Sequence, residues 1–224
     1  MTDVLTPRRE VLPPAQQKLW PLLAPAAELG FVLYGETAIA LRLGHRTSVD
    51  FDFFSSHPLD PRALAAALPF TRAATTLQAT PDTLTFLASL PDSAPHEVKV
   101  SFFAMPGFGR IGQPERTDDG VLRVASSVDL LATKLKTILQ RAEAKDYRDI
   151  AALLRAGSDL ATGLGAARTL FGPNFQPGEA LKALVYFADG DLPALDEQDQ
   201  TLLTRASSRV GELPHLRVAS PLVD

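Results

Sequence analysis

The sequence contains no cysteine among its 224 residues, which excludes disulfide bonds, zinc–thiolate sites and catalysis by a thiol. It also has little excess of charge of either sign. The formal net charge of -4 gives no overall attraction for nucleic acid, so any such binding requires a local basic patch. The N-terminal stretch lacks the apolar run of a signal peptide, and no segment approaches the length of a membrane span. We therefore expect a cytoplasmic protein that does not enter a membrane.

The apolar content is sufficient for a sizeable core, since hydrophobic residues make up 46% of the sequence and charged residues 21%. The patterns of apolar and turn residues change near residue 125. Before that point, helical patterns alternate with strand-like ones; the helical patterns lie at residues 15–30, 35–45 and 61–68, and the strand-like ones at 31–35, 48–56, 71–80, 82–90, 96–106 and 121–125. Residues 107–120 have the composition of a loop. After residue 125 the patterns are helical, with two helices in 126–157 and others at 159–170, 178–188 and 198–210.

These patterns predict an α/β fold with two subdomains. Residues 1–125 would form a mixed β-sheet flanked by helices, and residues 126–224 a helical subdomain that completes a shared site.

The run "SVDFDFFSS" at residues 48–56 places two acids inside an apolar strand. Residues two apart on a strand share a face, so Asp50 and Asp52 project together while Val49, Phe51 and Phe53 pack on the other face. Two carboxylates this close repel each other, and burying them without a partner is costly. Either an ion pair neutralises them, or they hold Mg²⁺, which prefers oxygen ligands and takes one or two protein carboxylates with phosphate and water.

The segment upstream of this strand favours the metal. The strand "FVLYG" runs directly into a helix at Gly35, Glu36 and Thr37. A helix start offers free backbone N–H groups and a positive dipole end to a phosphate, and a glycine at the turn lets the backbone approach the ligand closely. The combination predicts a phosphate site beside a metal site.

Two segments of the chain resemble a known family. "LYGETAIALRLGHRTSVDFDFFS" closely resembles the first motif of the AbiEii/AbiGii toxin family, within the DNA polymerase β-like nucleotidyltransferase superfamily, and "DLLATKLKTILQRAEAKDYRDIAALL" resembles its second conserved block. The resemblance implies a nucleotidyltransferase fold that uses Mg²⁺ to move a nucleoside monophosphate from an NTP to an acceptor. Some relatives modify tRNA and are paired with a separately encoded antitoxin. It therefore suggests tRNA or another RNA as acceptor, and a cognate antitoxin as partner.

The resemblance also assigns roles near the first motif. Asp50 and Asp52 would be the metal ligands and catalytic residues. The candidate nucleotide-binding residues around them are Gly35, Glu36, Thr37, Arg46 and Ser48. Arg46 follows the end of a helix, where a cation complements the helix dipole, so a structural role is the alternative there.

In the helical part, the helical wheel selects one lysine. Lys134 lies at the edge of an apolar arc, whereas Lys136 points away. Lys134 would either reach the triphosphate, as the family motif implies, or extend along the helix edge into water. Arg141, about two turns further on nearly the same face, would extend a phosphate or RNA patch or be a solvated charge.

The next helix supplies the acids of the second block. Asp146 lies within its apolar arc, Asp149 just outside, and Arg148 points to solvent. Asp146 is therefore a candidate partner of Lys134 or general base, with Asp149 as the alternate. An ion pair between the subdomains would explain Asp146 equally well.

Two positions depart from the family pattern. Glu36 stands where the family has Gly or Ser, and a carboxylate there would repel phosphates unless it points away or binds metal. The later strand "EVKVSFF" carries Glu97, Lys99 and Ser101 on the face where the superfamily often has a third acid. A nucleotide- or partner-binding pseudoenzyme therefore remains an alternative. So does an enzyme with a small-molecule acceptor, which the lack of a long basic stretch favours over RNA.

Overall fold

The computed structural model describes residues 4–90, 97–219 and 222, and it divides the chain into two units. The first contains the described residues before 110, residues 113–125 and Leu222; the second contains residues 110–112 and 126–219. Every β-strand of the described chain lies in the first unit, and the second is built from helices. The expected fold class, a mixed sheet with flanking helices followed by a helical part, is confirmed.

The sheet of the first unit has eight strands in the order β1-β7-β8-β2-β3-β6-β5-β4. β3 lies near its centre, antiparallel to β2 and parallel to β6. The strands are β1 Val4–Leu5, β2 Val32–Tyr34, β3 Asp50–Ser55, β4 Thr75–Ala79, β5 Thr83–Ser89, β6 Glu97–Ala104, β7 Glu115–Thr117 and β8 Arg123–Val124. The central strands thus bring the acidic strand between the glycine-turn strand β2 and the strand β6.

The alternation expected for β3 is present. Phe51 and Phe53 are fully buried, and Phe53 stacks on Phe102 of β6 with ring centroids 5.2 Å apart. Asp50 and Asp52 lie on the opposite, half-buried face. The prediction that Val49 packs with the phenylalanines is wrong, because β3 begins only at Asp50 and Val49 is 46% exposed.

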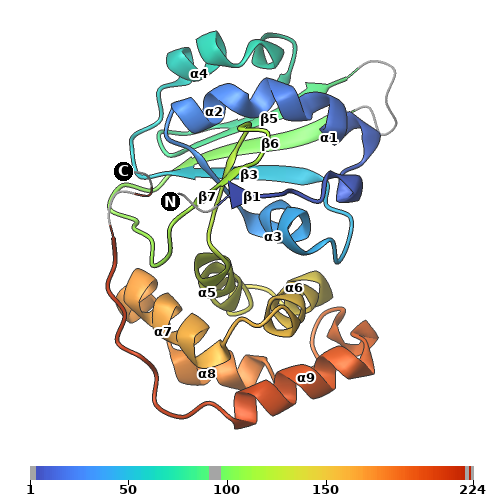
Figure 1. Cartoon of the computed structure of the whole chain (residues 1–224), viewed down its shortest axis with the longest axis vertical. Helices are drawn as coiled ribbons and strands as arrows, with labels where there is room; N and C mark the ends of the chain where they lie inside the picture. The colour runs from blue at the N-terminus through green and yellow to red at the C-terminus, as the bar shows by residue number, and fades with distance from the viewer. Residues whose placement is uncertain (1–3, 91–96, 220–221, 223–224) are drawn as a thin grey trace. The chain divides into compact units, whose positions relative to one another are not determined.

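Four α-helices flank the sheet: α1 Pro14–Leu19, α2 Ala24–Glu28, α3 Gly35–Leu43 and α4 Pro61–Ala67. In Figure 1, α1, α2 and α4 lie over one face of the sheet and α3 lies over the other. The helix expected over residues 15–30 is interrupted by a 3-10 segment, η2 Trp20–Leu23. Pro21 and Pro25 explain the interruption, since proline lacks the N–H that an α-helix needs in its interior.

The second unit contains α5 Ser127–Thr137, α6 Ala144–Arg155, α7 Leu160–Phe171, α8 Pro177–Ala183 and α9 Glu197–Ser208. α5 packs against α6 and α7. Gly163 permits the close approach of α7, because a Cβ there would lie 2.5 Å from a Leu131 methyl group. Among the residues described, no helix is both long and apolar enough to cross a membrane.

Some expected boundaries differ from those observed. The loop predicted for residues 107–120 contains β7, β1 was not predicted at all, and the helix expected to reach residue 188 ends at Ala183. The strand expected from residue 96 begins at Glu97, and His96 itself lies outside the described residues. The remaining short helices are 3-10 turns: η1 Arg9–Val11, η3 Pro69–Arg72, η4 Gly172–Asn174 and η5 Leu192–Ala194.

Candidate active site

The turn from β2 into α3 lies directly against the acidic strand. Gly35 has a φ of +72°, and a Cβ at this position would lie 2.9 Å from Oδ2 of Asp52. Glycine is therefore required here both by the backbone conformation and by the closeness of the carboxylate. Tyr34, the residue that precedes α3, makes no side-chain capping hydrogen bond to the helix. The Tyr34 side chain thus does not cap the first-turn N–H groups of α3. A phosphate-binding turn requires such uncapped N–H groups.

The question of what neutralises the two aspartates is answered by the neighbouring strand β6. In the parallel register, Lys99 lies opposite Asp50 and Ser101 lies opposite Asp52. The ammonium nitrogen of Lys99 is 2.7 Å from Oδ2 of Asp50. The sequence had placed Lys99 on the relevant face without assigning it a role; the parallel pairing of β3 with β6, which no local pattern encodes, is what brings it to the site.

The electrostatics of the pair centre on Asp52. Burial raises the pKa of the Asp52 carboxyl, and the negative charge of Asp50 raises it further. The charge of Lys99 and a hydrogen bond from Ser101 act in the opposite direction without cancelling the rise. A nearby cation would stabilise the ionised form of this buried carboxylate beside a second negative charge, so this end of β3 is suited to a positively charged ligand.

The predicted nucleotide-binding side chains beside the turn are bonded to one another. Thr37 and Ser48 are both buried, and their hydroxyls are hydrogen-bonded at 2.6 Å. The Thr37 hydroxyl also donates to the backbone carbonyl of Asp50, which holds α3 against β3. Glu36 accepts a hydrogen bond from Arg46 at 3.1 Å, and its other carboxylate oxygen lies 3.4 Å from the Ser48 hydroxyl oxygen. The carboxylate that departs from the family pattern is therefore neutralised by Arg46.

The residues of the second block form a separate cluster within the second unit. The Lys134 ammonium lies 2.7 Å from Oδ1 of Asp146 and 2.7 Å from Oδ2 of Asp149. Arg141 donates to both oxygens of Asp146, at 2.8 Å and 3.1 Å. The side chains of both aspartates are fully buried. Lys134 is thus the partner of Asp146, which is one of the roles that the sequence left open for Asp146.

The charge state of Asp146 follows from these contacts. Burial acts to raise its pKa, but the hydrogen bonds from Arg141 and the charge of Lys134 outweigh burial, and the pKa lies below its ordinary value. A carboxylate that is ionised, buried and bonded at both oxygens is a weak proton acceptor. The cluster is therefore better suited to holding Lys134 and Arg141 in place than to general-base catalysis by Asp146.

Two expectations about this cluster need correction. Asp149 was placed outside the apolar arc, yet it is fully buried because Lys134 pairs with it. Arg141 is not on the helix of Lys134, since α5 ends at Thr137; it reaches Asp146 from the segment between α5 and α6. Lys136 is half-buried, as its phase predicts, and it donates to the backbone carbonyl of Asn174.

The donor set of the first cluster fits Mg²⁺ shared with a substrate. Asp50 and Asp52 offer carboxylate oxygens on one face, and Mg²⁺ commonly takes one or two carboxylates together with phosphate oxygens and water. The described residues contain no group of three or more His, Cys, Asp or Glu that could hold a metal. The described residues alone therefore do not supply a complete set of Mg²⁺ ligands. The two aspartates would need phosphate oxygens and water to complete the coordination.

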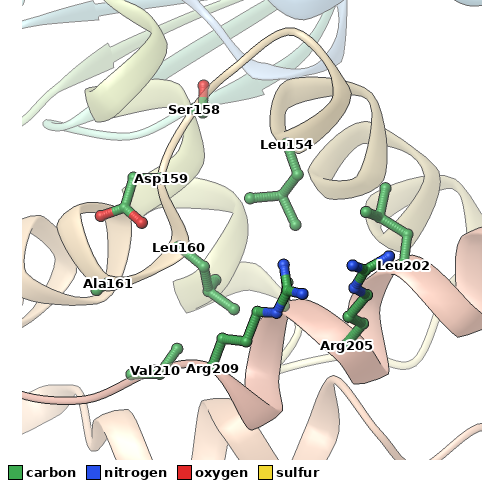
Figure 2. Close-up of a pocket in the computed structure, with 10 residues that line it drawn as sticks. Leu154, Ser158, Asp159, Leu160, Ala161, Leu202, Arg205, Arg209 and Val210 are labelled. Atoms are coloured by element: carbon green, nitrogen blue, oxygen red, sulfur yellow. The ribbon is translucent and has the colours of Figure 1, made fainter.

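The second unit has a cavity of about 410 Å³ that is not lined by Lys134, Arg141, Asp146 or Asp149 (Figure 2). It is lined by α9, the start of α7 and the end of α6, and Figure 2 shows beside it Arg205 of α9 and Arg209, which directly follows α9. Asp159 also lines it, but Oδ2 of this residue caps α7 by accepting from the Thr162 N–H and hydroxyl. None of the residues assigned by the sequence lines this cavity.

The fold defines the class of protein. MenT4, a nucleotidyltransferase toxin from Mycobacterium tuberculosis, has a similar structure, with a TM-score of 0.60 at 12% identity over 88% of this chain and 84% of MenT4. An antigenic nucleotidyltransferase-like protein from Paracoccidioides brasiliensis is also similar, with a TM-score of 0.52 at 16% identity over 92% of this chain and 96% of the other. The fold is that of the nucleotidyltransferases.

The family follows from the sequence. Residues 19–207 match the family described as "Nucleotidyl transferase AbiEii toxin, Type IV TA system", and the chain belongs to this family. An uncharacterized protein of Aquifex aeolicus is 32% identical over 162 residues, which are 71% of this chain and 74% of that protein. The resemblance seen in the two motifs is confirmed, and the chain is a nucleotidyltransferase of a toxin–antitoxin family. This membership weighs against a binding module without turnover.

Proposed function

We propose that this protein transfers a nucleoside monophosphate from an NTP to an RNA acceptor, with tRNA as the leading candidate, and that it requires Mg²⁺. The observation that carries the proposal is the pair Asp50 and Asp52 on one face of β3, held against the Gly35 turn at the start of α3. The membership of the chain in a toxin family supports a toxin role controlled by a cognate antitoxin in the cytoplasm, where NTPs are available.

The roles of the residues follow from their chemistry. Asp50 and Asp52 would hold Mg²⁺, which when bound neutralises charge on the transferring phosphoryl group. The N–H groups at the start of α3 would receive phosphate oxygens, and Gly35 leaves room for them. Thr37 and Ser48 position α3 and β3 through their mutual hydrogen bond, so they act on the nucleotide through the backbone that they hold.

The second cluster has a supporting role in this proposal. Lys134 and Arg141 are the cations of this cluster, and Asp146 and Asp149 hold the Lys134 ammonium in place. Because both oxygens of Asp146 are occupied, general-base catalysis is not assigned to it. Asp149 stays the alternate candidate for that role.

A small-molecule acceptor is the second candidate. The net charge of -4 favours it, because RNA binding relies on phosphate contacts that a basic surface supplies. In this case the same carboxylate pair and the same NTP would serve, and only the acceptor would differ.

The experiment that tests the proposal is a transfer assay with each of the four NTPs labelled at the α-phosphate. The purified protein would be incubated with Mg²⁺ and total tRNA, and the label followed into RNA, protein and small molecules. We expect label in RNA, lost on addition of EDTA. Label only in a small-molecule fraction would support the second candidate, and no transfer to any fraction would contradict both.

A further inference from the structure

The strand β6 presents a lysine and a serine where a third metal-binding acid would stand. In the parallel pairing with β3, Lys99 is opposite Asp50 and Ser101 is opposite Asp52. Glu97, the acid nearest to them on this strand, is two residues before Lys99, about 6–7 Å further along. It is exposed, and its register partner on β5 is Ser89. On the side that faces the carboxylate pair, β6 therefore carries an ammonium group and a hydroxyl in place of an acid.

The contacts of Lys99 limit what the pair can bind. Its ammonium holds Oδ2 of Asp50 at 2.7 Å, and Ser101 donates to the Asp52 carboxylate. The Lys99 side chain is 42% exposed, so an anionic ligand beside the two aspartates can also reach it. Glu36, which is ion-paired with Arg46, adds a further negative charge near Asp52 and also raises its pKa.

Binding two ions requires more ligands than this site provides. Two-metal sites place their ions about 3.5–4 Å apart and share carboxylates between them. Mg²⁺ demands near-ideal octahedral geometry and gives up water reluctantly. With two carboxylates, one of them already bonded to an ammonium, the site has oxygens for one ion, and a second ion would meet the positive charge of Lys99.

We propose that Lys99 takes the place of a second metal ion. The aspartate pair then binds a single divalent ion together with the NTP, and the Lys99 ammonium supplies the additional positive charge beside the triphosphate. This inference rests on the proposed function and specifies how many metal ions the site uses.

The test is to count bound metal ions. Mn²⁺ would replace Mg²⁺, the ligand would be a mixture of the four α,β-methylene NTP analogues, and bound Mn²⁺ would be measured by electron paramagnetic resonance under saturating conditions. We expect one Mn²⁺ per chain in the wild type and two in Lys99→Glu, which supplies the third acid. Lys182→Glu is the matched control. It makes the same change in charge at a residue with a 76% exposed side chain on α8, and should bind one.

A second variant keeps the test decisive if Lys99→Glu fails to fold with three acids together. Lys99→Gln removes the ammonium without adding a carboxylate, so it should still bind one Mn²⁺ but bind the analogues roughly tenfold more weakly or worse. Unchanged analogue affinity in Lys99→Gln would overturn the role of Lys99.

The outcomes also separate this inference from the proposed function. Two Mn²⁺ ions in the wild type, or one in a folded Lys99→Glu, would overturn the inference and leave a metal-dependent transferase intact. No Mn²⁺ bound with the analogues in the wild type would overturn the metal-dependent function itself.

Discussion

A single glycine decides how closely the start of α3 approaches the carboxylate pair. Gly35 has a φ of +72°, and its missing Cβ would lie 2.9 Å from Oδ2 of Asp52. Gly107 has a similar φ of +79°, but a Cβ there would meet nothing within 4 Å. Comparing an alanine substitution at each glycine therefore distinguishes the free-energy cost of the backbone conformation from that of the contact with Asp52.

We predict that Gly35→Ala destabilises the protein by about 1–2 kcal/mol more than Gly107→Ala. Both variants incur the left-handed backbone cost, which is about 1–2 kcal/mol, and only Gly35→Ala must also displace Asp52. Chemical denaturation of both variants measures the difference in the free energy of unfolding. Equal losses would show that Gly35 and Asp52 are not in close contact.

Lys134 provides the second test at the scale of the residue. Its removal leaves Asp146 and Asp149 buried without their lysine, and breaking a buried ion pair in this way costs about 3–5 kcal/mol. Arg141 remains beside Asp146, so we expect Lys134→Ala to lower the free energy of unfolding by about 3 kcal/mol, at the low end of that range. Lys136→Ala should cost about 1 kcal/mol or less.

The affinity for NTP distinguishes the two roles of Lys134. If the residue is purely structural, the folded fraction of Lys134→Ala should bind NTP as the wild type does. If it also reaches the triphosphate, affinity should fall roughly tenfold to a hundredfold. Equal losses of stability at positions 134 and 136 would contradict the buried cluster.

The sequence predicted the positions of single residues only as far as local periodicity allows. Strand alternation placed Asp50 and Asp52 together correctly, and the helical wheel turned Lys134 and Asp146 inward. It misplaced Asp149, because a paired aspartate can be buried outside an apolar arc. It could not assign Lys99, whose place beside Asp50 depends on a strand pairing between segments about fifty residues apart.

At the scale of elements, the long segments with clear ends were predicted, whereas the short strands β1 and β7 were missed. The helix α3 was marked by Gly35 at its start and by Gly44, with a φ of +69°, at its end. β1 and β7 have two and three residues, too few for a period of two to be recognised. The order of the strands in the sheet was not predictable, since it depends on long-range pairing.

Asp129 ties the start of α5 to the segment Arg110–Gly112. Its carboxylate accepts hydrogen bonds from the Ile111 and Gly112 N–H groups at 2.8 Å and 3.0 Å, and from the Ser126 hydroxyl at 2.6 Å. Asp129 is 1% exposed, so its partners would be left unsatisfied in a buried place if the carboxylate were removed.

We therefore predict that Asp129→Ala lowers the free energy of unfolding by about 2–3 kcal/mol. Asp159→Ala, which removes the exposed cap of α7, should cost only about 1 kcal/mol. Thermal or denaturant unfolding of both variants measures the contrast. A smaller loss for Asp129→Ala than for Asp159→Ala would contradict the tethering role.

For the molecule as a whole, the cluster around Asp146 makes stability depend on pH. The pKa of Asp146 is lowered in the folded state, so the ionised group stabilises the protein above the unfolded pKa of about 3.9. That contribution is lost as the pH falls through the lower folded value. Asp146→Asn should therefore be less stable than the wild type at pH 7, with a difference that shrinks below about pH 4. A difference in melting temperature that stayed constant from pH 7 to pH 3 would contradict this assignment.

The most direct test of the central claim is the rate of nucleotidyl transfer by Asp50→Asn and Asp52→Asn beside the wild type, in Mg²⁺ and at NTP saturation. Because both carboxylates are assigned to the metal, we predict that transfer falls to the level without enzyme in each variant. Both variants should stay folded, and relief of the repulsion that raises the pKa of Asp52 should leave the melting temperature equal or slightly higher. Wild-type transfer in either folded variant would contradict the account.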